Sequence, residues 1–425
     1  MFFPHTGLFR LCGFLLRGIV MKYDFTSILE RHGKDAIAVD GLGTGFAPSA
    51  PKEGFDAIPM WVADMNFPTV STIQEAIIER TKHPMFGYFN ATKEYYDSII
   101  QWQEKRNGVT GLTAEAIGYE NGVLGGVISA LNCVCSRGDK ILIHSPTYIG
   151  FTMSLKNNGY EAVHSPLVKD ENGVWRMDFE DMEKHLKEEH IHAAIMCNPH
   201  NPCGRVWERW ELEKAMALFK KYDVYVISDE IWSDLILPGH HHIPTQTVSE
   251  DAKMRTVAMY APSKTFNLAG MMISNVIIRD EDMRKIWLDR HYNFDNPLSI
   301  AAAQAAYEKG DEWLQELRAY LDGNFEFTVN YLKEHLPKAK CRISEATYLA
   351  WVDLSAYFEP DEHLPLFFAY KAGVLLEGGN MFVQSSDGFI RLNLACPRAT
   401  VEEGLRRICE AVNTKHTEKY LGEQN

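Results

Sequence analysis

Between about residues 115 and 280, short runs of β-branched residues alternate with longer stretches of helical periodicity. This alternation constrains the fold most, because strands that are separated by helices pair in parallel and the helices cover the sheet. We therefore expect an α/β fold whose large domain holds a mostly parallel sheet sandwiched by helices. The predicted strands cover residues 116–120, 140–145, 193–198, 224–229, 256–261 and 274–280.

The chain changes character after about residue 298. Residues 299–336 are rich in Ala, Leu and Glu, and their apolar positions lie three and four residues apart, which predicts long helices. Strand-like segments return at 346–354 and 388–395, and a helix at 400–413 follows. We expect a large domain over residues 65–295 and a smaller α+β domain over 296–425, to which an N-terminal segment over 21–64 contributes.

The first twenty residues differ from the rest. Residues 1–20 are apolar, with Arg10 and Arg17 interspersed, and they lack a small-residue cleavage site. A signal peptide carries its positive charge before the apolar run, whereas here the charge lies within it. We interpret this segment as a non-native extension upstream of a start at Met21.

Charge and composition exclude several classes of partner. The 43 basic and 57 acidic residues give a net charge of -14 without a long basic run, which argues against nucleic-acid binding. No stretch reaches the roughly 18 apolar residues of a membrane span. The eight cysteines form neither a disulfide framework nor paired metal-binding spacings, which favours a cytoplasmic protein. The GHHHI segment at 239–243 lacks matching carboxylate or cysteine ligands, so we expect an exposed loop and no metal.

Three polar side chains follow three of the predicted strands. Asn201 lies in NPHNPCGR, Asp229 begins DEIW, and Lys264 lies in APSKTFNLAG. Singly, they are explained as a turn, a helix cap and a surface lysine. Together they would lie at the carboxyl edge of one sheet, where ligands bind in parallel α/β folds. An amide, an acid and a lysine in this order suit pyridoxal 5'-phosphate (PLP), whose aldehyde condenses with a lysine amine and whose ring nitrogen pairs with a carboxylate.

Seven segments carry a wider resemblance. They are IPMWVADMNFP (58–68), FGYFNATKEYYDSI (86–99), HSPTYIGF (144–151), NPHNPCGRVW (198–207), SDEIW (228–232), APSKTFNLAG (261–270) and GFIRLNLACPR (388–398). In them the chain resembles fold-type-I PLP enzymes of the aspartate aminotransferase superfamily, and more narrowly the MalY/PatB-type carbon-sulfur β-lyases. The resemblance implies a lyase that cleaves cystathionine, cysteine or related sulfur amino acids to pyruvate, ammonia and a thiol.

Two alternatives remain open at this point. A class I/II aminotransferase would use the same residues, so no sequence rule separates the two reactions. A PLP protein with an added regulatory binding role is the second alternative. The intact set of Lys264, Asp229 and Asn201 argues against a purely binding role.

The resemblance implies a role for each residue around the cofactor. Lys264 would bond covalently to the cofactor and shuttle the substrate's α-proton, and Asp229 would pair with the ring nitrogen. Asn201 would donate to the ring's 3'-oxygen and help to bind substrate. Tyr148 would stack on the ring, and Arg391 would grip the substrate α-carboxylate in a bidentate fork. For Tyr148 and Arg391 the alternatives are a core aromatic residue and a strand-edge arginine.

The resemblance also implies a phosphate site shared between subunits. The backbone N–H groups of Val123 and Leu124, after a glycine turn, would bind the phosphate at a helix N-terminus. Ser263 would add a hydroxyl, and Tyr88 would reach the phosphate of the neighbouring subunit. The active unit would then be a homodimer with shared active sites.

Two positions depart from the family pattern. Position 272 is Met, where many aminotransferases have an arginine that clamps the phosphate. Trp232 stands where the lyases usually have His and many aminotransferases have Tyr; its indole N–H can donate a hydrogen bond but cannot accept one or titrate. The first change bears on how the phosphate is bound, and the second bears on the ring oxygen.

Overall fold

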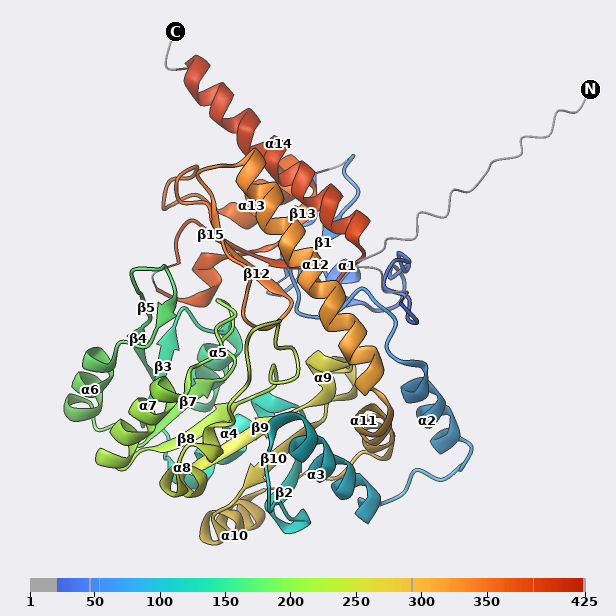
Figure 1. The fold of residues 1–425 in the computed structure, drawn as a ribbon, viewed down its shortest axis with the longest axis vertical. Coiled ribbons are helices and arrows are strands. Elements are labelled where there is room, and N and C mark those ends of the chain that lie inside the picture. The colour runs from blue at the N-terminus through green and yellow to red at the C-terminus, as the bar shows by residue number, and fades with distance from the viewer. Residues whose placement is uncertain (1–20, 46, 53, 292, 385, 423–425) are drawn as a thin grey trace, which may run out of the picture.

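The computed structural model describes residues 21–422 except 46, 53, 292 and 385, and it describes only the backbone over 416–422. The interpretation of residues 1–20 as an extension therefore lies outside the described residues. In Figure 1 a large sheet with its helices forms the lower part of the molecule, and the C-terminal helices and a smaller sheet form the upper part. Within the described residues, no helix combines the length and the apolar character needed to cross a membrane.

A seven-stranded sheet forms the centre of the lower part of the described chain. Its strands, in spatial order, are β2 (Ile117–Glu120), β10 (Ser274–Ile278), β9 (Thr256–Tyr260), β8 (Tyr225–Asp229), β7 (Ala193–Cys197), β3 (Lys140–Ser145) and β4 (Glu161–Pro166). All neighbours pair in parallel except β10, which is antiparallel to β2 and β9. The predicted α/β fold and mostly parallel sheet are therefore confirmed.

Strand β4 was missed by the sequence prediction. Its sequence EAVHSP contains Glu, His, Ser and Pro, and only two of its six residues are buried. By contrast, β7, β9 and β10 are buried at every position, which produces the continuous apolar runs that made them visible. An edge strand with one exposed face gives a much weaker pattern.

Helices cover both faces of this sheet. One face packs against α4 (Val123–Val134), α5 (Ile149–Asn158) and α10 (Glu281–Arg290). The other packs against α6 (Phe179–Glu188), α7 (Arg209–Lys221) and α8 (Glu250–Arg255). With both faces covered, the functional groups of the sheet can reach a ligand only at the ends of the strands.

A third group of helices leads from the large sheet to the smaller one. Helices α2 (Ser71–Thr81) and α3 (Lys93–Asn107) pack against α11 (Pro297–Lys309), and α12 (Asp311–His335) follows after Gly310. The predicted long helices over 299–336 are thus confirmed, with a break at Gly310. A Cβ at this position would lie 2.3 Å from the Phe266 ring, so the ring occupies the space that any larger residue would need.

The smaller sheet of the described chain has four antiparallel strands. They are β11 (Lys340–Cys341), β12 (Leu349–Asp353), β15 (Phe389–Asn393) and β14 (Glu377–Gly378), and α13 (Leu364–Ala372) and α14 (Arg398–Gly422) lie beside them. Strand β1 (Ile58–Pro59) pairs with β13 (Val374–Leu375), which joins the N-terminal segment to the C-terminal part. The short elements α1 (Ile37–Asp40), β5 (Val168–Lys169) and β6 (Trp175–Arg176) complete these regions, and the domain boundaries stay a prediction.

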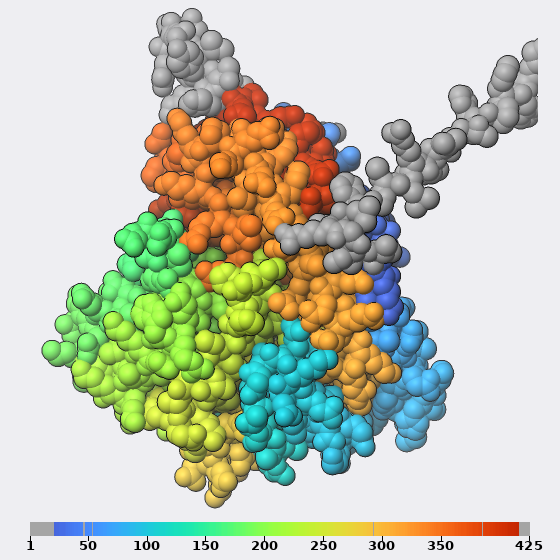
Figure 2. All heavy atoms as spheres, viewed as in Figure 1, coloured from blue at the N-terminus to red at the C-terminus, as the bar shows by residue number. Residues whose placement is uncertain are grey.

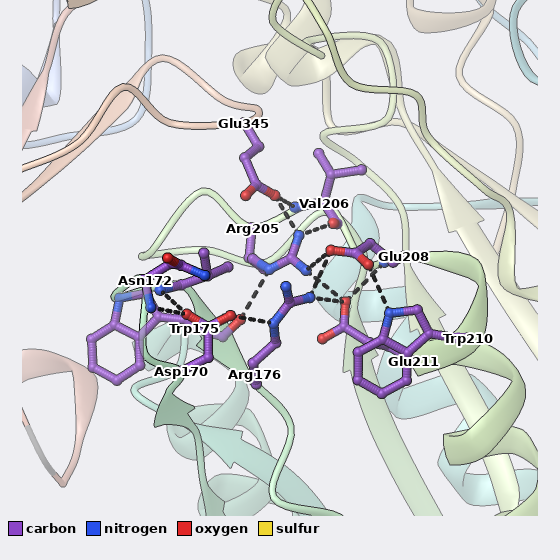
Figure 3. A network of polar contacts seen from close by, with 11 residues as sticks. Asp170, Asn172, Trp175, Arg176, Arg205, Val206, Glu208, Trp210, Glu211 and Glu345 are labelled. Atoms are coloured by element: carbon purple, nitrogen blue, oxygen red, sulfur yellow. Dashed lines mark hydrogen bonds and ion pairs between the residues drawn. The ribbon is translucent and has the colours of Figure 1, made fainter.

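A buried ion-pair network ties the loop after β7 to the C-terminal part (Figure 3). Arg205 pairs with Glu211 on α7 at 2.6 Å and with Glu345, just before β12, at 2.5 Å. Figure 2 shows the orange residues of the C-terminal part packed directly against the green and yellow-green part of this face. This network joins the loop after β7 to the segment that precedes β12.

Candidate active site

The register of the sheet brings three strand ends to one edge. Cys197 at the end of β7 pairs with Asp229 at the end of β8, and Asp229 pairs with Met259 near the end of β9. Asn201 follows β7 by four residues, and Lys264 lies in the short helix α9 (Pro262–Thr265) directly after β9. The structure therefore places the predicted amide, acid and lysine at the same edge, as the parallel topology predicts.

Asp229 is an acid in an apolar setting. Its side chain is buried, and its Oδ1 accepts a hydrogen bond from the Ile231 backbone N–H at 3.1 Å. Burial raises the pKa of Asp229 to about 7, and the nearby Lys264 charge opposes this rise. A positively charged group placed beside this carboxyl would stabilise its ionised form.

Lys264 is the matching base. Burial, together with the charge of Arg391, lowers the pKa of its amine to about 8. The amine donates to the Ala63 carbonyl at 2.9 Å. A lysine with a lowered pKa has a sizeable neutral fraction near pH 8, which makes it a nucleophile and a general base.

The N-terminal segment around Ala63 is bound to several residues of the site through its backbone. Besides Lys264, the Tyr348 hydroxyl donates to the Ala63 carbonyl at 2.8 Å. Asn267, three residues after Lys264, makes two hydrogen bonds of 2.9 Å with the Met65 backbone. Asn393 on β15 donates to the Val62 carbonyl at 2.8 Å. The IPMWVADMNFP segment thus connects the lysine turn to the small sheet, a role that its sequence did not reveal.

Arg391 on β15 is buried with its guanidinium in this site. Its Nη1 donates to Asn201 Oδ1 at 3.1 Å, and its Nη2 donates to the Trp61 carbonyl at 3.1 Å. Nη2 also forms an ion pair with Glu377 on the adjacent strand β14. Burial raises the pKa of Glu377, whereas the charges of Arg391 and Lys264 lower it. Glu377 was missed by sequence analysis, because no local motif marks it.

Tyr148 and the first turn of α4 lie together. Gly122, with φ of 83°, precedes α4, which begins at Val123. A Cβ at Gly150 would lie 2.3 Å from the Tyr148 ring and 3.0 Å from a Leu124 methyl group, so the ring passes over Gly150 next to Leu124. The predicted phosphate loop and the predicted stacking tyrosine are therefore neighbours. Ser263 is half-buried immediately before Lys264.

The two departures from the family pattern both lie near this site. Met272 has a left-handed backbone, and its methyl carbon lies 3.8 Å from the position of a Cβ at Gly122. It therefore stands beside the N-terminus of α4, where a thioether supplies no charge. Trp232 is buried, with its ring 4.9 Å from that of Tyr348 in an edge-to-face arrangement and 5.8 Å from the Lys264 amine.

Tyr88 lies outside this cluster in the single chain. It is 95% exposed, and its ring lies 5.4 Å from that of Phe294. Met85 and Phe86 beside it are also exposed. The predicted contact of Tyr88 with the phosphate of a neighbouring subunit stays a prediction.

The prediction of an exposed GHHHI loop is wrong for His242. His240 and His241 are exposed, but the His242 side chain is 2% exposed, and its Nε2 lies 2.7 Å from a Glu230 carboxylate oxygen. The Tyr260 hydroxyl donates to the same oxygen at 2.5 Å. His242 turns inward because it partners a buried carboxylate, which the loop composition does not reveal. Within the described ranges, no three His, Cys, Asp or Glu side chains form a group that could hold a metal.

Comparison with known proteins agrees with this geometry. The family model described as aminotransferase class I and II matches residues 58–408. The chain belongs to this family.

Several relatives of this class I/II aminotransferase-family chain are C-S lyases. The chain is 37% identical to cystathionine beta-lyase PatB of Bacillus subtilis (strain 168) over 388 residues, covering 90% of this chain and 98% of PatB. The PLP-bound C-S lyase from Staphylococcus hominis matches with a TM-score of 0.87 and 40% identity, covering 93% of this chain and 99% of that one. Cystalysin from Treponema denticola, which contains PLP, matches with a TM-score of 0.86 and 30% identity, covering 93% and 100%. These matches confirm the resemblance and the fold type that the seven motifs implied.

Proposed function

We propose that this chain is a PLP-dependent carbon-sulfur β-lyase that converts cystathionine, cysteine or related sulfur amino acids to pyruvate, ammonia and a thiol. One observation carries the proposal: in a chain 40% identical to a PLP-bound C-S lyase, Lys264 has a lowered pKa and lies in a buried site with Asp229 and Arg391. This combination supplies a nucleophilic amine, an acid for a ring nitrogen and a cation for a carboxylate.

The residues present fit PLP. Asp229 is a buried carboxyl, and a cationic ring nitrogen beside it would stabilise the ionised form that burial disfavours. Gly122 lets the chain turn into α4 with a positive φ, which exposes the first backbone N–H groups of the helix to an anion. When bound, PLP supplies an electron sink that stabilises negative charge at the α-carbon of an amino acid.

Each side chain then has a defined task. Lys264 would hold the cofactor and take the α-proton, and Asp229 would pair with the ring nitrogen. The amide oxygen of Asn201 accepts from Arg391, which leaves its NH₂ group to donate to the ring oxygen. Arg391 would bind the substrate α-carboxylate, and Tyr148 would pack against the ring. The N–H groups of Val123 and Leu124 and the Ser263 hydroxyl would hold the phosphate, and the Trp232 indole N–H could donate to the ring oxygen.

The reaction is tested by supplying L-cystathionine without any keto acid. A lyase regenerates its starting state in every turnover, so we expect pyruvate to accumulate far beyond one equivalent per active site. An aminotransferase without an acceptor stops after one equivalent. If pyruvate release stops there while a keto acid supports steady transamination, the aminotransferase alternative replaces the lyase. A purified protein that acquires no visible absorption band with added PLP would favour a purely binding role.

We propose that the protein is a homodimer with shared active sites. We also propose that it is located in the cytoplasm. The exposed apolar side chains of Met85, Phe86 and Tyr88 support an interface on this segment. The seven cysteines in the described part of the chain are all unpaired, which suits a reducing compartment.

Subunit mixing tests the sharing of active sites. We combine Tyr88→Phe subunits with Lys264→Ala subunits, each almost inactive alone. A mixed dimer would have one site with both defects and one with neither, so an equal mixture should recover about a quarter of wild-type activity. Lys264→Ala subunits mixed with Lys264→Ala,Tyr88→Phe subunits are the control and should recover none. If the first mixture recovers none either, the phosphate contact does not cross the interface.

A further inference from the structure

The carboxylate of Glu377 lies against the guanidinium of Arg391. The two residues pair across the antiparallel strands β14 and β15, so their side chains project from the same face. The Glu377 side chain is 8% exposed and that of Arg391 is 3% exposed. With so little water around the pair, each charge needs a partner of opposite charge, because an uncompensated buried charge is costly.

The Arg391 guanidinium therefore has partners within the protein before any substrate binds. Nη1 is bound to Asn201, and Nη2 is bound to both the Trp61 carbonyl and Glu377. Nε is buried and has no hydrogen-bond partner among the described residues. A carboxylate that approaches the guanidinium can use Nε, but it meets the like charge of Glu377 at the Nη2 side.

We propose that Glu377 is a positioning residue that occupies Arg391 as an internal carboxylate and is displaced by the α-carboxylate of the substrate. This inference rests on the proposed role of Arg391 in substrate binding. The pair orients the guanidinium toward Asn201 and Trp61 while the site is empty. It also selects for ligands with a free α-carboxylate, because an uncharged amide cannot compete with a carboxylate for a guanidinium.

The charges around Glu377 make this exchange feasible. Arg391 on β15 and Lys264 on α9 are the cations that act on its carboxyl. Helix α13 also packs against β14, and its titratable residues Tyr370 and Lys371 are exposed to solvent. With Lys264 close by, a displaced Glu377 carboxylate keeps a cation in reach, and removal of Glu377 leaves Arg391 without its charged partner.

The test measures binding to the holoenzyme by isothermal titration calorimetry. The probes are L-alanine, which has an α-carboxylate and no leaving group, and L-alaninamide, which lacks the carboxylate. In Glu377→Gln we expect the Kd of L-alanine to fall by about fivefold or more, because the competing charge is gone. The Kd of L-alaninamide should stay unchanged. Glu377→Asp, with a shorter reach, should shift in the same direction to a smaller extent.

A matched control removes a carboxylate from another buried arginine. Glu345 pairs with Arg205 at 2.5 Å outside the proposed site (Figure 3), so Glu345→Gln should change neither Kd. A Kd of L-alanine that rises or stays constant in Glu377→Gln overturns the proposal, and so does an equal change in Glu345→Gln. Steady-state kinetics add a second readout: in Glu377→Gln the KM for cystathionine should fall.

The proposed function can fail separately from this inference. If the holoenzyme does not eliminate thiols but Glu377→Gln still tightens L-alanine binding, the lyase reaction is wrong and the carboxylate exchange stands. If Arg391→Gln binds L-alanine as tightly as the wild type, Arg391 is not the carboxylate site. The exchange then fails together with the role of Arg391.

Discussion

Replacing Lys264 with alanine should lower kcat/KM for cystathionine by at least about 10³-fold, because one side chain serves as both the covalent anchor and the base. The change should also remove the borohydride-reducible adduct with PLP, which mass spectrometry of a digest detects. Lys253→Ala, at a partly exposed surface lysine that pairs with Glu250, is the control and should retain both properties. An adduct that persists on another lysine would show that the anchor is misplaced.

The pH dependence of covalent PLP loading checks the same side chain. Since burial lowers the pKa of Lys264 to about 8, its amine is mostly protonated below pH 8 and mostly neutral above it. Only the neutral amine attacks an aldehyde. The loading rate of the cofactor-free chain should therefore rise as pH increases through about 8 and then level off, and an exposed lysine would show this rise only near pH 10.

Replacing Asp229 with asparagine should lower kcat by about 10² to 10⁴-fold while leaving the covalent adduct on Lys264 in place. Asparagine keeps an oxygen that can accept from the Ile231 N–H, but it removes the negative charge that holds a proton on the ring nitrogen. The cofactor should then be bound but ineffective as an electron sink. Absorbance and adduct formation measure binding, and pyruvate release measures the reaction.

Thermal unfolding of the cofactor-free chain separates this effect from damage to the fold. Burial raises the pKa of Asp229 from 3.8 to about 7, so the folded state binds the proton more tightly than the unfolded state does. The stability contributed by this group is full below about pH 3.8 and is lost as pH rises through 7. At pH 8, Asp229→Asn should therefore melt at the same temperature as the wild type or above it. A large fall in melting temperature would mean that Asp229 has a structural role instead.

Much of the fold was predictable because its central strands are buried on both faces. The apolar runs at 193–197 and 256–260 stand out from the sequence, and the helices between them have a clear period. Strand β4 was not predictable in the same way, since one of its faces is exposed. The antiparallel direction of β10 also depends on the path of the chain between strands, which periodicity does not record.

The sequence by itself determined which chemical groups follow the strand ends. Asn201, Asp229 and Lys264 each lie within a few residues of a buried strand, so parallel pairing places them together whatever the rest of the chain does. The position of Gly122 directly before α4 follows from the local sequence in the same way. These residues were found because their positions relative to one strand or helix are sufficient to place them.

Only the tertiary structure determined which groups from distant parts of the chain lie around Asn201, Asp229 and Lys264. Glu377 meets Arg391 through strand pairing, the Ala63 carbonyl meets Lys264 across 201 residues of sequence, and His242 meets Glu230 inside the molecule. Burial then shifts the pKa of Lys264 down and that of Asp229 up, because packing removes much of the water around both groups. Contacts between distant segments and the burial of charged side chains arise only when the whole chain packs. No local motif therefore predicts either of them.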